Sequence, residues 1–185
     1  MSSPRAVLVR PRESSDVSTL MQILNNVYNL TRYPVDGPPS FPARFSSPKA
    51  LYSFVAIYND GIAGHAELQP AAVLNPIVKQ SLVSHGPIES FATLVTLFVD
   101  PKIQSKGIGA RLVEEALAWG RREGKRLALI VLDKDFAAIR MYEKMGWQRD
   151  IEYFYETGQG VRYKAFSYIA PVNSTPQTPE HSNNQ

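Results

Sequence analysis

Two continuously apolar segments, separated by one amphipathic helical pattern, constrain the fold of this chain more than any other feature. They are FATLVTLFV at 91–99 and LALIVL at 127–132. Strands of a parallel sheet are covered on both faces and have this composition, whereas a strand with one wet face alternates apolar and polar residues. Between them, residues 107–123 place apolar side chains on one face of a helix. The three segments predict a right-handed parallel βαβ unit at the centre of a sheet.

The remaining patterns place further strands and helices around this unit. Residues 31–48 contain several prolines and a glycine, so no regular element is expected there. Residues 70–88 are ambiguous, with a short helix expected from about Asn75. The other expected elements are a strand at 6–11, a helix at 16–30 behind a cap at Ser15 and Asp16, a hairpin at 52–69 that turns at Asn59, Asp60 and Gly61, a helix at 135–146, and a closing hairpin formed by 147–155 and 161–169.

The order of these elements, β-α-β-β-β-α-β-α-β-β, predicts an α/β fold. We expect a mixed sheet of about six or seven strands, with the parallel pair at its centre and helices on its flanks. Residues 1–170 have the length and the apolar content of a single domain. Residues 171–185 are polar and show no apolar pattern, so this tail is expected to be disordered.

Composition argues against several kinds of site and partner. The chain has no cysteine, which excludes disulfides, thiolate metal sites and a cysteine nucleophile. One of its three histidines lies in the polar tail, so no metal site is expected. The formal net charge of +3 slightly favours an anionic ligand and is too small to indicate nucleic acid. No segment resembles a membrane span or a signal peptide, so we expect a cytoplasmic protein without a membrane partner.

The segment QSKGIG at 104–109 stands at the start of the 107–123 helix and predicts an anion site. It is not a P-loop, because the glycine spacing and the lysine–hydroxyl pair of that motif are missing. It is not a dinucleotide fingerprint, because seven residues, 100–106, separate Gly107 from the strand and Leu112 occupies the third glycine position. Backbone N–H groups at a helix N-terminus can still hold a phosphate, since the two glycines leave the backbone accessible and Lys106 adds positive charge.

This segment matches the Gln/Arg-x-x-Gly-x-Gly/Ala motif of acetyl-CoA-dependent N-acetyltransferases. The longer stretch LFVDPKIQSKGIGARLVEEALAWGRREG resembles the cofactor-binding core of the GNAT superfamily, and AAIRMYEKMGW resembles its second motif. The two motifs cover about 97–147, and the expected order of elements is similar to that of the family over about 6–169. The resemblance implies an acyltransferase with acetyl-CoA as co-substrate. It implies that the cofactor contacts Gln104, Ser105, Lys106, Gly107, Ile108, Gly109 and Ala110.

The resemblance also implies where the acyl end of the cofactor lies. In GNAT proteins the two central strands splay apart, and the pantetheine arm bonds the backbone of the first, here Leu97, Phe98 and Val99. An N–H of this strand, such as that of Val99, is expected to stabilise the oxyanion. Tyr142 matches the family tyrosine that protonates the departing thiolate, and a packing tyrosine is the alternative. Asp135 stands where many relatives have a cofactor-binding asparagine, and its carboxylate can accept a hydrogen bond or cap the helix.

No general base is marked by the resemblance. Glu67 and His65, on the strand after Gly64, are candidates because of their place in the chain, and Glu89 ahead of the central strand is another. Base catalysis through a water molecule is the alternative to all three. Among these we expect Glu67 to act as the catalytic base.

The acceptor side of a GNAT fold is usually lined by the first helix, its following loop and the last hairpin. In that loop Tyr33 and Asp36 combine an aromatic surface with an acid, which suits an amine, although ordinary packing explains them equally well. The expected function is acetyl transfer to a primary amine of a small or amino-acid-like acceptor, by direct attack through a tetrahedral intermediate. A protein or peptide acceptor and a non-catalytic acyl-CoA-binding module are the alternatives. A homodimer is compatible with the sequence.

Overall fold

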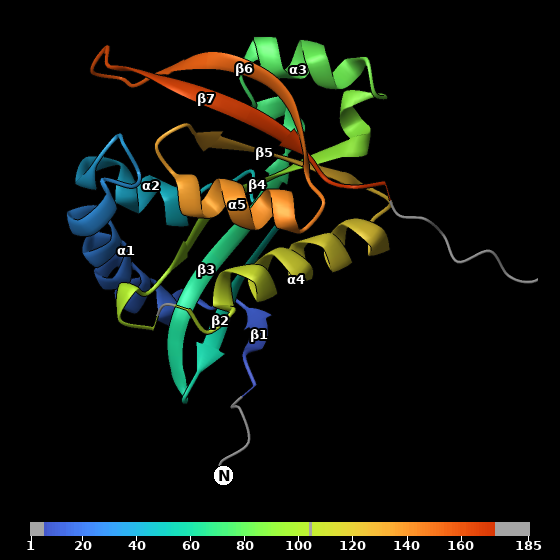
Figure 1. Ribbon diagram of the computed structural model, residues 1–185. Coiled ribbons are helices and arrows are strands. Elements are labelled where there is room, and N and C mark those ends of the chain that lie inside the picture. Colours follow the sequence, from blue (N-terminus) through green and yellow to red (C-terminus); the bar gives the residue numbers. More distant parts are fainter. Residues whose placement is uncertain (1–5, 104, 173–185) are drawn as a thin grey trace, which may run out of the picture.

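A seven-stranded mixed sheet lies at the centre of the part of the chain that the computed structural model describes, residues 6–103 and 105–172 (Figure 1). The strand order is β1-β2-β3-β4-β5-β7-β6, in which β4 and β5 are parallel and the other neighbours are antiparallel. The predicted α/β fold with a central parallel pair is therefore confirmed. The strands are β1 (Leu8–Pro11), β2 (Tyr52–Tyr58), β3 (Gly61–Pro70), β4 (Phe91–Val99), β5 (Arg126–Leu132), β6 (Gln148–Glu156) and β7 (Arg162–Ile169).

Helices cover both faces of this sheet (Figure 1). α4 and α5 pack on one face, α1 and α2 lie on the other, and α3 packs against β6. The α-helices are α1 (Val17–Thr31), α2 (Phe41–Phe45), α3 (Pro76–Val83), α4 (Ile108–Arg122) and α5 (Phe136–Lys144). Short 3₁₀ turns are η1 (Ser14–Asp16), η2 (Pro38–Ser40), η3 (Ala71–Val73), η4 (Ile88–Ser90) and η5 (Pro101–Ile103).

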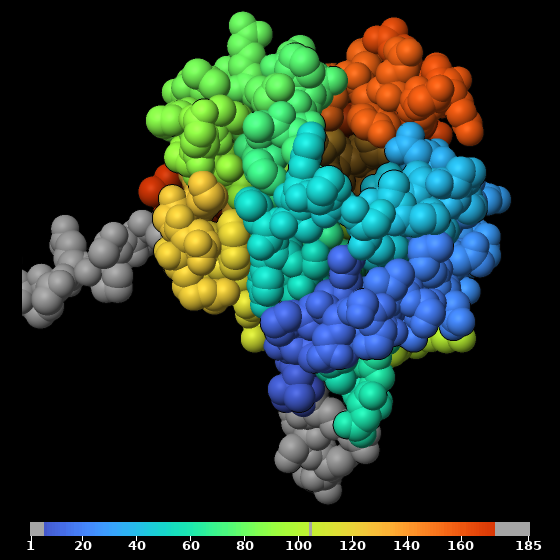
Figure 2. Space-filling model, turned by 180° about the vertical axis from the view of Figure 1, so that it is seen from behind, coloured from blue at the N-terminus to red at the C-terminus, as the bar shows by residue number. Residues whose placement is uncertain are grey.

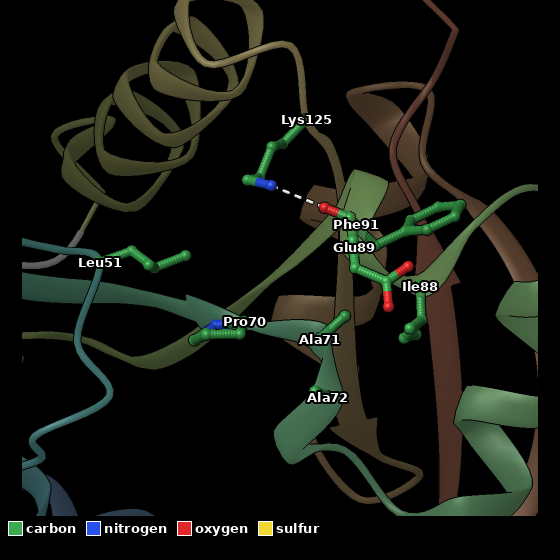
Figure 3. Close-up of a pocket in the computed structure, with 8 residues that line it drawn as sticks. All are labelled: Leu51, Pro70, Ala71, Ala72, Ile88, Glu89, Phe91 and Lys125. Carbon is green, nitrogen blue, oxygen red and sulfur yellow. Dashed lines mark hydrogen bonds between the residues drawn. The ribbon is translucent and has the colours of Figure 1, made fainter.

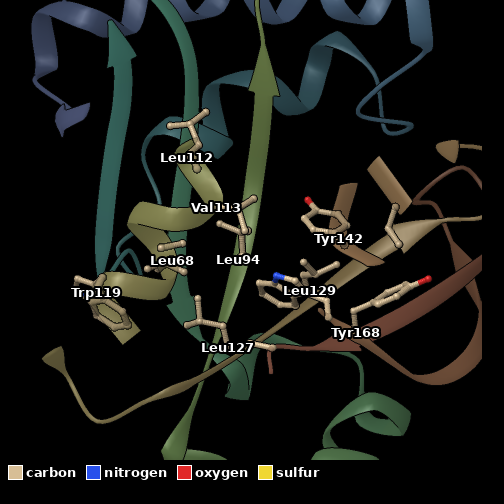
Figure 4. Close-up of a cluster of buried hydrophobic side chains, with 14 of the residues drawn as sticks. Leu68, Leu94, Leu112, Val113, Trp119, Leu127, Leu129, Tyr142 and Tyr168 are labelled. Carbon is tan, nitrogen blue, oxygen red and sulfur yellow. The ribbon is translucent and has the colours of Figure 1, made fainter. Parts of the chain in front are cut away.

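The central βαβ unit forms because α4 has one continuous apolar face. Ile108, Leu112, Val113 and Ala116 on that face are buried in one cluster with side chains of β3, β4 and β5 (Figure 4). Removing a side chain such as Leu112 from water contributes about 1.5–3 kcal/mol. The face predicted from the helical spacing is thus the one that holds α4 on the sheet.

The prediction that residues 31–48 form no regular element is wrong. Residues Phe41–Phe45 form α2, and Pro42 stands in its first turn. A proline is tolerated there because the N–H that it lacks would have no partner inside the helix. Phe41 and Phe45 are one turn apart and both are buried, Phe41 against Tyr28 of α1 and Phe45 against His65 of β3, which stabilises this short helix.

The parallel pair separates partway along its length. β4 and β5 pair from Phe91 with Arg126 as far as Leu94 with Leu129. Beyond this point β4 remains paired with β3, while β5 continues along β7. The C-terminal halves of the two central strands therefore form a fork, and Figure 1 shows them diverging.

Of the tail predicted at 171–185, Pro171 and Val172 are described and the remainder lies outside the described residues. Every helix in the described part of the chain is too short or too polar to cross a membrane.

Candidate active site

The backbone of β4 faces the fork with alternate amide groups. The N–H of Asp100 donates to the carbonyl of Ala63 on β3, at 2.8 Å. Because successive amides of an extended strand point to opposite edges, the N–H groups of Val99 and Leu97 point away from β3, toward the edge that β5 has left. The amide of Phe98 points toward β3 instead, and its ring is buried against α1 and α2. Of the three predicted backbone contacts, Leu97 and Val99 are the ones that face the fork.

A β-bulge interrupts β4 immediately before these amides. The register of β3 against β4 shifts between His65–Phe98 and Glu67–Val95, which gives β4 one extra residue. Within the bulge Thr96 adopts φ of 52°, a left-handed conformation that is unusual for a β-branched residue. Sequence reasoning missed this bulge, because the apolar and β-branched run of β4 predicts an uninterrupted strand.

The glycine motif forms a turn that ends in the N-terminus of α4. Ser105 and Gly107 both have left-handed backbone, with φ of 64° and 71°, and Gly107 is the N-cap of α4. The first N–H groups of an α-helix have no partner within it, so those of Ile108, Gly109 and Ala110 are available to an anion. A Cβ built on Gly107 would meet no atom within 4 Å, so the backbone is accessible there.

The second glycine of the motif has a different surrounding. A Cβ on Gly109 would lie 3.2 Å from the sulfur of Met141 on α5 and 3.7 Å from a methyl of Val99. This glycine therefore allows α4 to pack closely on α5 and β4. Ser105 and Lys106 are exposed beside it, whereas Gln104 lies outside the described residues. Together with the helix N-terminus, the cationic side chain of Lys106 makes this end of β4 suited to a phosphate group.

Tyr142 of α5 fills the base of the fork. Its side chain is 6% exposed and belongs to the same core cluster as Leu94 and Leu129, the last paired residues of β4 and β5 (Figure 4). The ring packs against Trp147 and Tyr168, with centroid distances of 5.7 and 6.4 Å. Burial raises the pKa of the phenol well above its usual value of 10, so Tyr142 remains protonated at working pH.

Two other predicted site residues lie close enough to Tyr142 to affect its pKa. After the larger effect of burial, the pKa of Tyr142 is raised further by Tyr33 in its ionised form and by the carboxylate of Asp135. Burial also raises the pKa of Tyr33. The fold therefore brings Tyr33, in the loop after α1, near Tyr142 and Asp135, which both belong to α5 and its N-cap.

Asp135 is the N-cap residue of α5, but its side chain makes no capping hydrogen bond. Its carboxylate accepts instead from the Nζ of Lys134, at 2.8 Å. The same Nζ donates to the carbonyl of Thr31 at the end of α1, at 3.1 Å. Lys134 thus joins the start of α5 to the end of α1, and of the two roles expected for the Asp135 carboxylate it accepts a hydrogen bond and does not cap the helix.

Asp36 is held by groups from two other elements. Its Oδ2 accepts from the hydroxyl of Tyr155 on β6, at 2.9 Å, and lies 3.3 Å from the Nη2 of Arg44 on α2. Burial, followed by the hydrogen bond to Asp36, raises the pKa of Tyr155 to about 12. The loop after α1 and the last hairpin therefore meet at Asp36.

A cavity of about 310 Å³ lies beside this contact. Figure 2 shows that face of the molecule, hollowed between the light-blue segment that contains α2 and the orange β6–β7 hairpin. The floor of the cavity includes Val95 and Thr96, directly before the amides that face the fork, and its one charged lining residue is Arg44. The lining residues are Ser40, Ala43, Arg44, Ser47, Gln69, Val95 and Thr96.

Glu67 lies beneath this cavity and is 0% exposed. Its two oxygens accept from the hydroxyl of Ser53 and from the Nε2 of Gln69, each at 2.7 Å. The Nη1 of Arg12 lies 3.8 Å away. Since Gln69 also lines the cavity, it stands between the Glu67 carboxylate and any molecule bound there.

Glu89 lies just before the opposite end of β4, about 17 Å along the chain from Leu94, where the fork opens. It lines a separate cavity of about 250 Å³ whose walls are mostly apolar (Figure 3). Lys125 donates to the backbone carbonyl of Glu89 there, at 2.6 Å. This position removes Glu89 from the candidates for a general base at the fork.

Arg44 and Tyr155 are functional candidates that sequence reasoning missed. Arg44 lies in a segment for which the sequence predicts no regular element. Tyr155 is brought to the site by its contact with Asp36, which is 119 positions away in the sequence. The signal for Arg44 is the segment FPARF, where a proline near the start and two phenylalanines one turn apart are compatible with a short helix. Within the described residues no group of three or more His, Cys, Asp or Glu side chains has the arrangement of a metal site.

Comparison with known proteins identifies relatives of both the sequence and the fold. Residues 19–147 match the model of the acetyltransferase (GNAT) family. N-alpha-acetyltransferase 60 of Danio rerio is 25% identical over 150 residues, which are 76% of this chain and 62% of that protein. The match therefore spans less than two thirds of that relative.

Solved structures share the fold at lower identity. The ribosomal-protein-S18-alanine N-acetyltransferase of Escherichia coli has a TM-score of 0.66 at 23% identity, over 93% of this chain and 97% of that chain. Arabidopsis thaliana NAA60 in complex with a bisubstrate analogue has a TM-score of 0.68 at 21% identity, over 91% and 100%. A putative phosphinothricin N-acetyltransferase has a TM-score of 0.66 at 18% identity, over 91% and 99%.

Proposed function

The chain belongs to the acetyltransferase (GNAT) family, and we propose that it transfers an acetyl group from acetyl-CoA to a primary amine. The observation that supports this most strongly is the fork between β4 and β5, which has unpaired strand edges on one side and Tyr142 at its base. At the mouth of the fork, the accessible backbone of Gly107 starts α4. A long ligand with an anionic end and an amide-containing arm fits this combination.

In this proposal the pyrophosphate binds the residues from Gln104 to Ala110. The N–H groups at the start of α4 donate to its oxygens, and Lys106 adds a cation. The arm then enters the fork and bonds the backbone groups of Leu97 and Val99 like an added strand. Asp135, at the edge of the fork, accepts a hydrogen bond from the arm. Acetyl-CoA supplies the activated acetyl group, and the chain supplies its orientation.

The residues of the fork then assist a direct transfer. The acceptor nitrogen forms a bond to the thioester carbon, and the oxyanion of the tetrahedral intermediate accepts from an N–H of β4. As the carbon–sulfur bond breaks, the thiolate accepts the phenolic proton of Tyr142 while the amine loses a proton to the base. The raised pKa of Tyr142 makes it a constant hydrogen-bond donor to the sulfur and a weak acid, so the proton moves late in this step.

We retain Glu67 as the candidate base, with a water molecule in the cavity as the alternative. The carboxylate is buried and its hydrogen bonds are satisfied, so Gln69 must move aside or relay through water. Glu67→Gln tests the two readings, because it keeps the shape of the side chain. If Glu67 is the base, kcat falls by about 10²–10⁴. If water is the base, kcat changes little.

The acceptor in our proposal is a small amine that also carries a carboxylate, as an amino acid does. The cavity has the size of a small-ligand site, and its charged lining residue is the cation Arg44. A cation favours an acceptor with an anionic group, and it also lowers the pKa of the amine and so favours the neutral nucleophile. In this proposal Asp36 orients Arg44, and Tyr33 covers the amine end beside Tyr142.

A protein N-terminus is the second candidate acceptor, and the similarity to N-alpha-acetyltransferase 60 of Danio rerio favours it. A panel that follows release of free CoA distinguishes the two. Free amino acids should be acetylated, whereas the corresponding amino acid amides, which lack the carboxylate, should react more slowly. Faster acetylation of peptides than of any amino acid would favour the protein acceptor. Absence of turnover with every acceptor, despite CoA binding, would favour a non-catalytic acyl-CoA-binding module.

The proposal includes a cytoplasmic location, in which acetyl-CoA is available, and it is compatible with a monomer or a homodimer. Light scattering after size-exclusion chromatography would establish the oligomeric state.

A further inference from the structure

His65 of β3 is a buried polar side chain that the proposed chemistry does not use. It is 0% exposed and lies between the rings of Phe45 and Phe98, with centroid distances of 5.3 and 5.5 Å. Its Nδ1 lies 3.0 Å from the backbone carbonyl of Thr96, the left-handed residue of the β4 bulge. Burying a polar side chain costs free energy unless its polar atoms are hydrogen-bonded, and in His65 only Nδ1 has a partner among the described residues.

The hydrogen bond determines the protonation state of the ring. A carbonyl oxygen can only accept, so Nδ1 carries the proton and donates to Thr96. Burial, the largest effect, lowers the pKa of His65 to about 4, while the Thr96 bond and Asp16 raise it and Arg12 lowers it. The ring is therefore neutral at working pH, and Nε2 is a buried acceptor that lacks a partner within the described residues. His65 presents one donor, aimed at the bulge.

In the bulge, the direction of the Thr96–Leu97 peptide depends on which group binds the carbonyl of Thr96. Ala66 on β3 faces both Thr96 and Leu97, so the regular ladder cannot hold both peptides. The carbonyl of Thr96 and the N–H of Leu97 belong to one planar trans peptide and point in opposite directions. A hydrogen bond that holds the carbonyl toward β3 therefore turns the Leu97 N–H toward the fork.

The proposed direction of the cofactor shows what this N–H would meet. The pyrophosphate turn follows the C-terminal end of β4, so the arm enters the fork from that end and passes Val99 before Leu97. The reactive end lies deeper, toward Leu94 and the ring of Tyr142. Leu97 is thus closer to the thioester than Val99, although Val99 is the residue that the sequence favours for the oxyanion.

We propose that His65 is a positioning residue: by binding the carbonyl of Thr96, it aims the N–H of Leu97 at the thioester oxygen of acetyl-CoA. This inference rests on the proposed function, and it deepens that proposal by naming the oxyanion donor and the group that orients it. His65 itself does not touch the reacting atoms. It acts through the peptide between Thr96 and Leu97.

Variants at this site separate the donor from the packing of the ring. Asparagine places an amide N–H near the position of Nδ1, so His65→Asn keeps the bond to Thr96. His65→Leu fills a similar volume without a donor, and His65→Gln keeps polarity but moves the donor toward the position of Nε2. Leu68→Ala is the matched control, because Leu68 is equally buried on β3 and its side chain packs in the cluster on the α4 side of the sheet.

The readout is the amide resonance of Leu97 in ¹H–¹⁵N spectra with saturating CoA and with saturating acetyl-CoA. The difference between the two ligands reports the thioester oxygen and requires no acceptor. We expect a downfield shift of the Leu97 amide proton with acetyl-CoA relative to CoA in the wild type, in His65→Asn and in Leu68→Ala. We expect this shift to be lost in His65→Leu and in His65→Gln.

Kinetics provide the second readout. Mispositioning one oxyanion donor should lower kcat in His65→Leu by about 10–10²-fold, with KM for acetyl-CoA changed by less than about threefold, and His65→Asn should restore kcat. A folded His65→Leu or His65→Gln variant that retains the Leu97 shift overturns the inference. A shift at Val99 in place of Leu97 overturns it as well. If CoA perturbs no resonance at 105–110, the proposed function itself fails.

Discussion

The buried His65 should make the stability of the protein depend on pH in a window that few other groups share. Burial lowers the pKa of its imidazole from 6.5 to about 4. Between these values the unfolded chain binds a proton at this position and the folded chain does not, so the free energy of unfolding falls as pH decreases from 6.5 to 4. Each pKa unit corresponds to about 1.4 kcal/mol, so the loss attributable to His65 approaches about 3 kcal/mol at pH 4.

Urea denaturation at a series of pH values measures this loss directly. The wild-type curve should decline between pH 6.5 and 4, and His65→Asn should remove most of that decline, whatever its stability at pH 7. Leu68→Ala should be less stable throughout and keep the wild-type slope. The Arg10–Asp16 pair acts at lower pH, because its hydrogen bonds lower the pKa of Asp16 below 3.8. Parallel curves for the wild type and His65→Asn would refute the assignment of a neutral, buried imidazole.

Three further predictions concern the site and the chain end. Tyr142→Phe should lower kcat by about 10²–10⁴ with little change in acetyl-CoA binding, and the wild-type rate should show no alkaline limb from this phenol up to pH 10, as a pH profile of both proteins checks. Arg44→Gln should raise KM for amino acids by at least about tenfold and leave KM for amino acid amides unchanged, in the CoA-release assay. Truncation after Val172 should leave both the melting temperature and CoA binding unchanged, as differential scanning calorimetry and titration check.

The centre of the fold could be predicted because its signals are local. The burial of three central elements can be predicted directly from the sequence, because β4 and β5 are continuously apolar and α4 has apolar residues on one face. The turn at Asn59 and Asp60 has the left-handed residues that its sequence indicates. For the same reason the glycine turn at the start of α4 could be predicted, since a helix N-terminus and its glycines are consecutive residues.

Features that depend on contacts distant in sequence could not be predicted. The left-handed conformation of Thr96 conflicts with its own propensity and exists because β3 and His65 surround it. The burial of Glu67 follows from strand register, which brings Ser53 beside it. The contact of Asp36 with Tyr155 depends on the position of the β6–β7 hairpin relative to the loop after α1. The two residues are 119 positions apart, and no local sequence pattern specifies such a contact.

Isothermal titration with acetyl-CoA, comparing the wild type with Gly107→Val, tests the central claim most directly. Gly107 has φ of 71° and open space at its Cβ position, so valine there both strains the turn and occupies the path to the helix N-terminus. We predict one site of micromolar affinity in the wild type, no binding by a folded Gly107→Val variant, and normal binding by Gly158→Val, which changes a glycine in the distant hairpin. Absence of binding by the wild type, or equal binding by both glycine variants, would contradict an acetyl-CoA site at the fork and the turn.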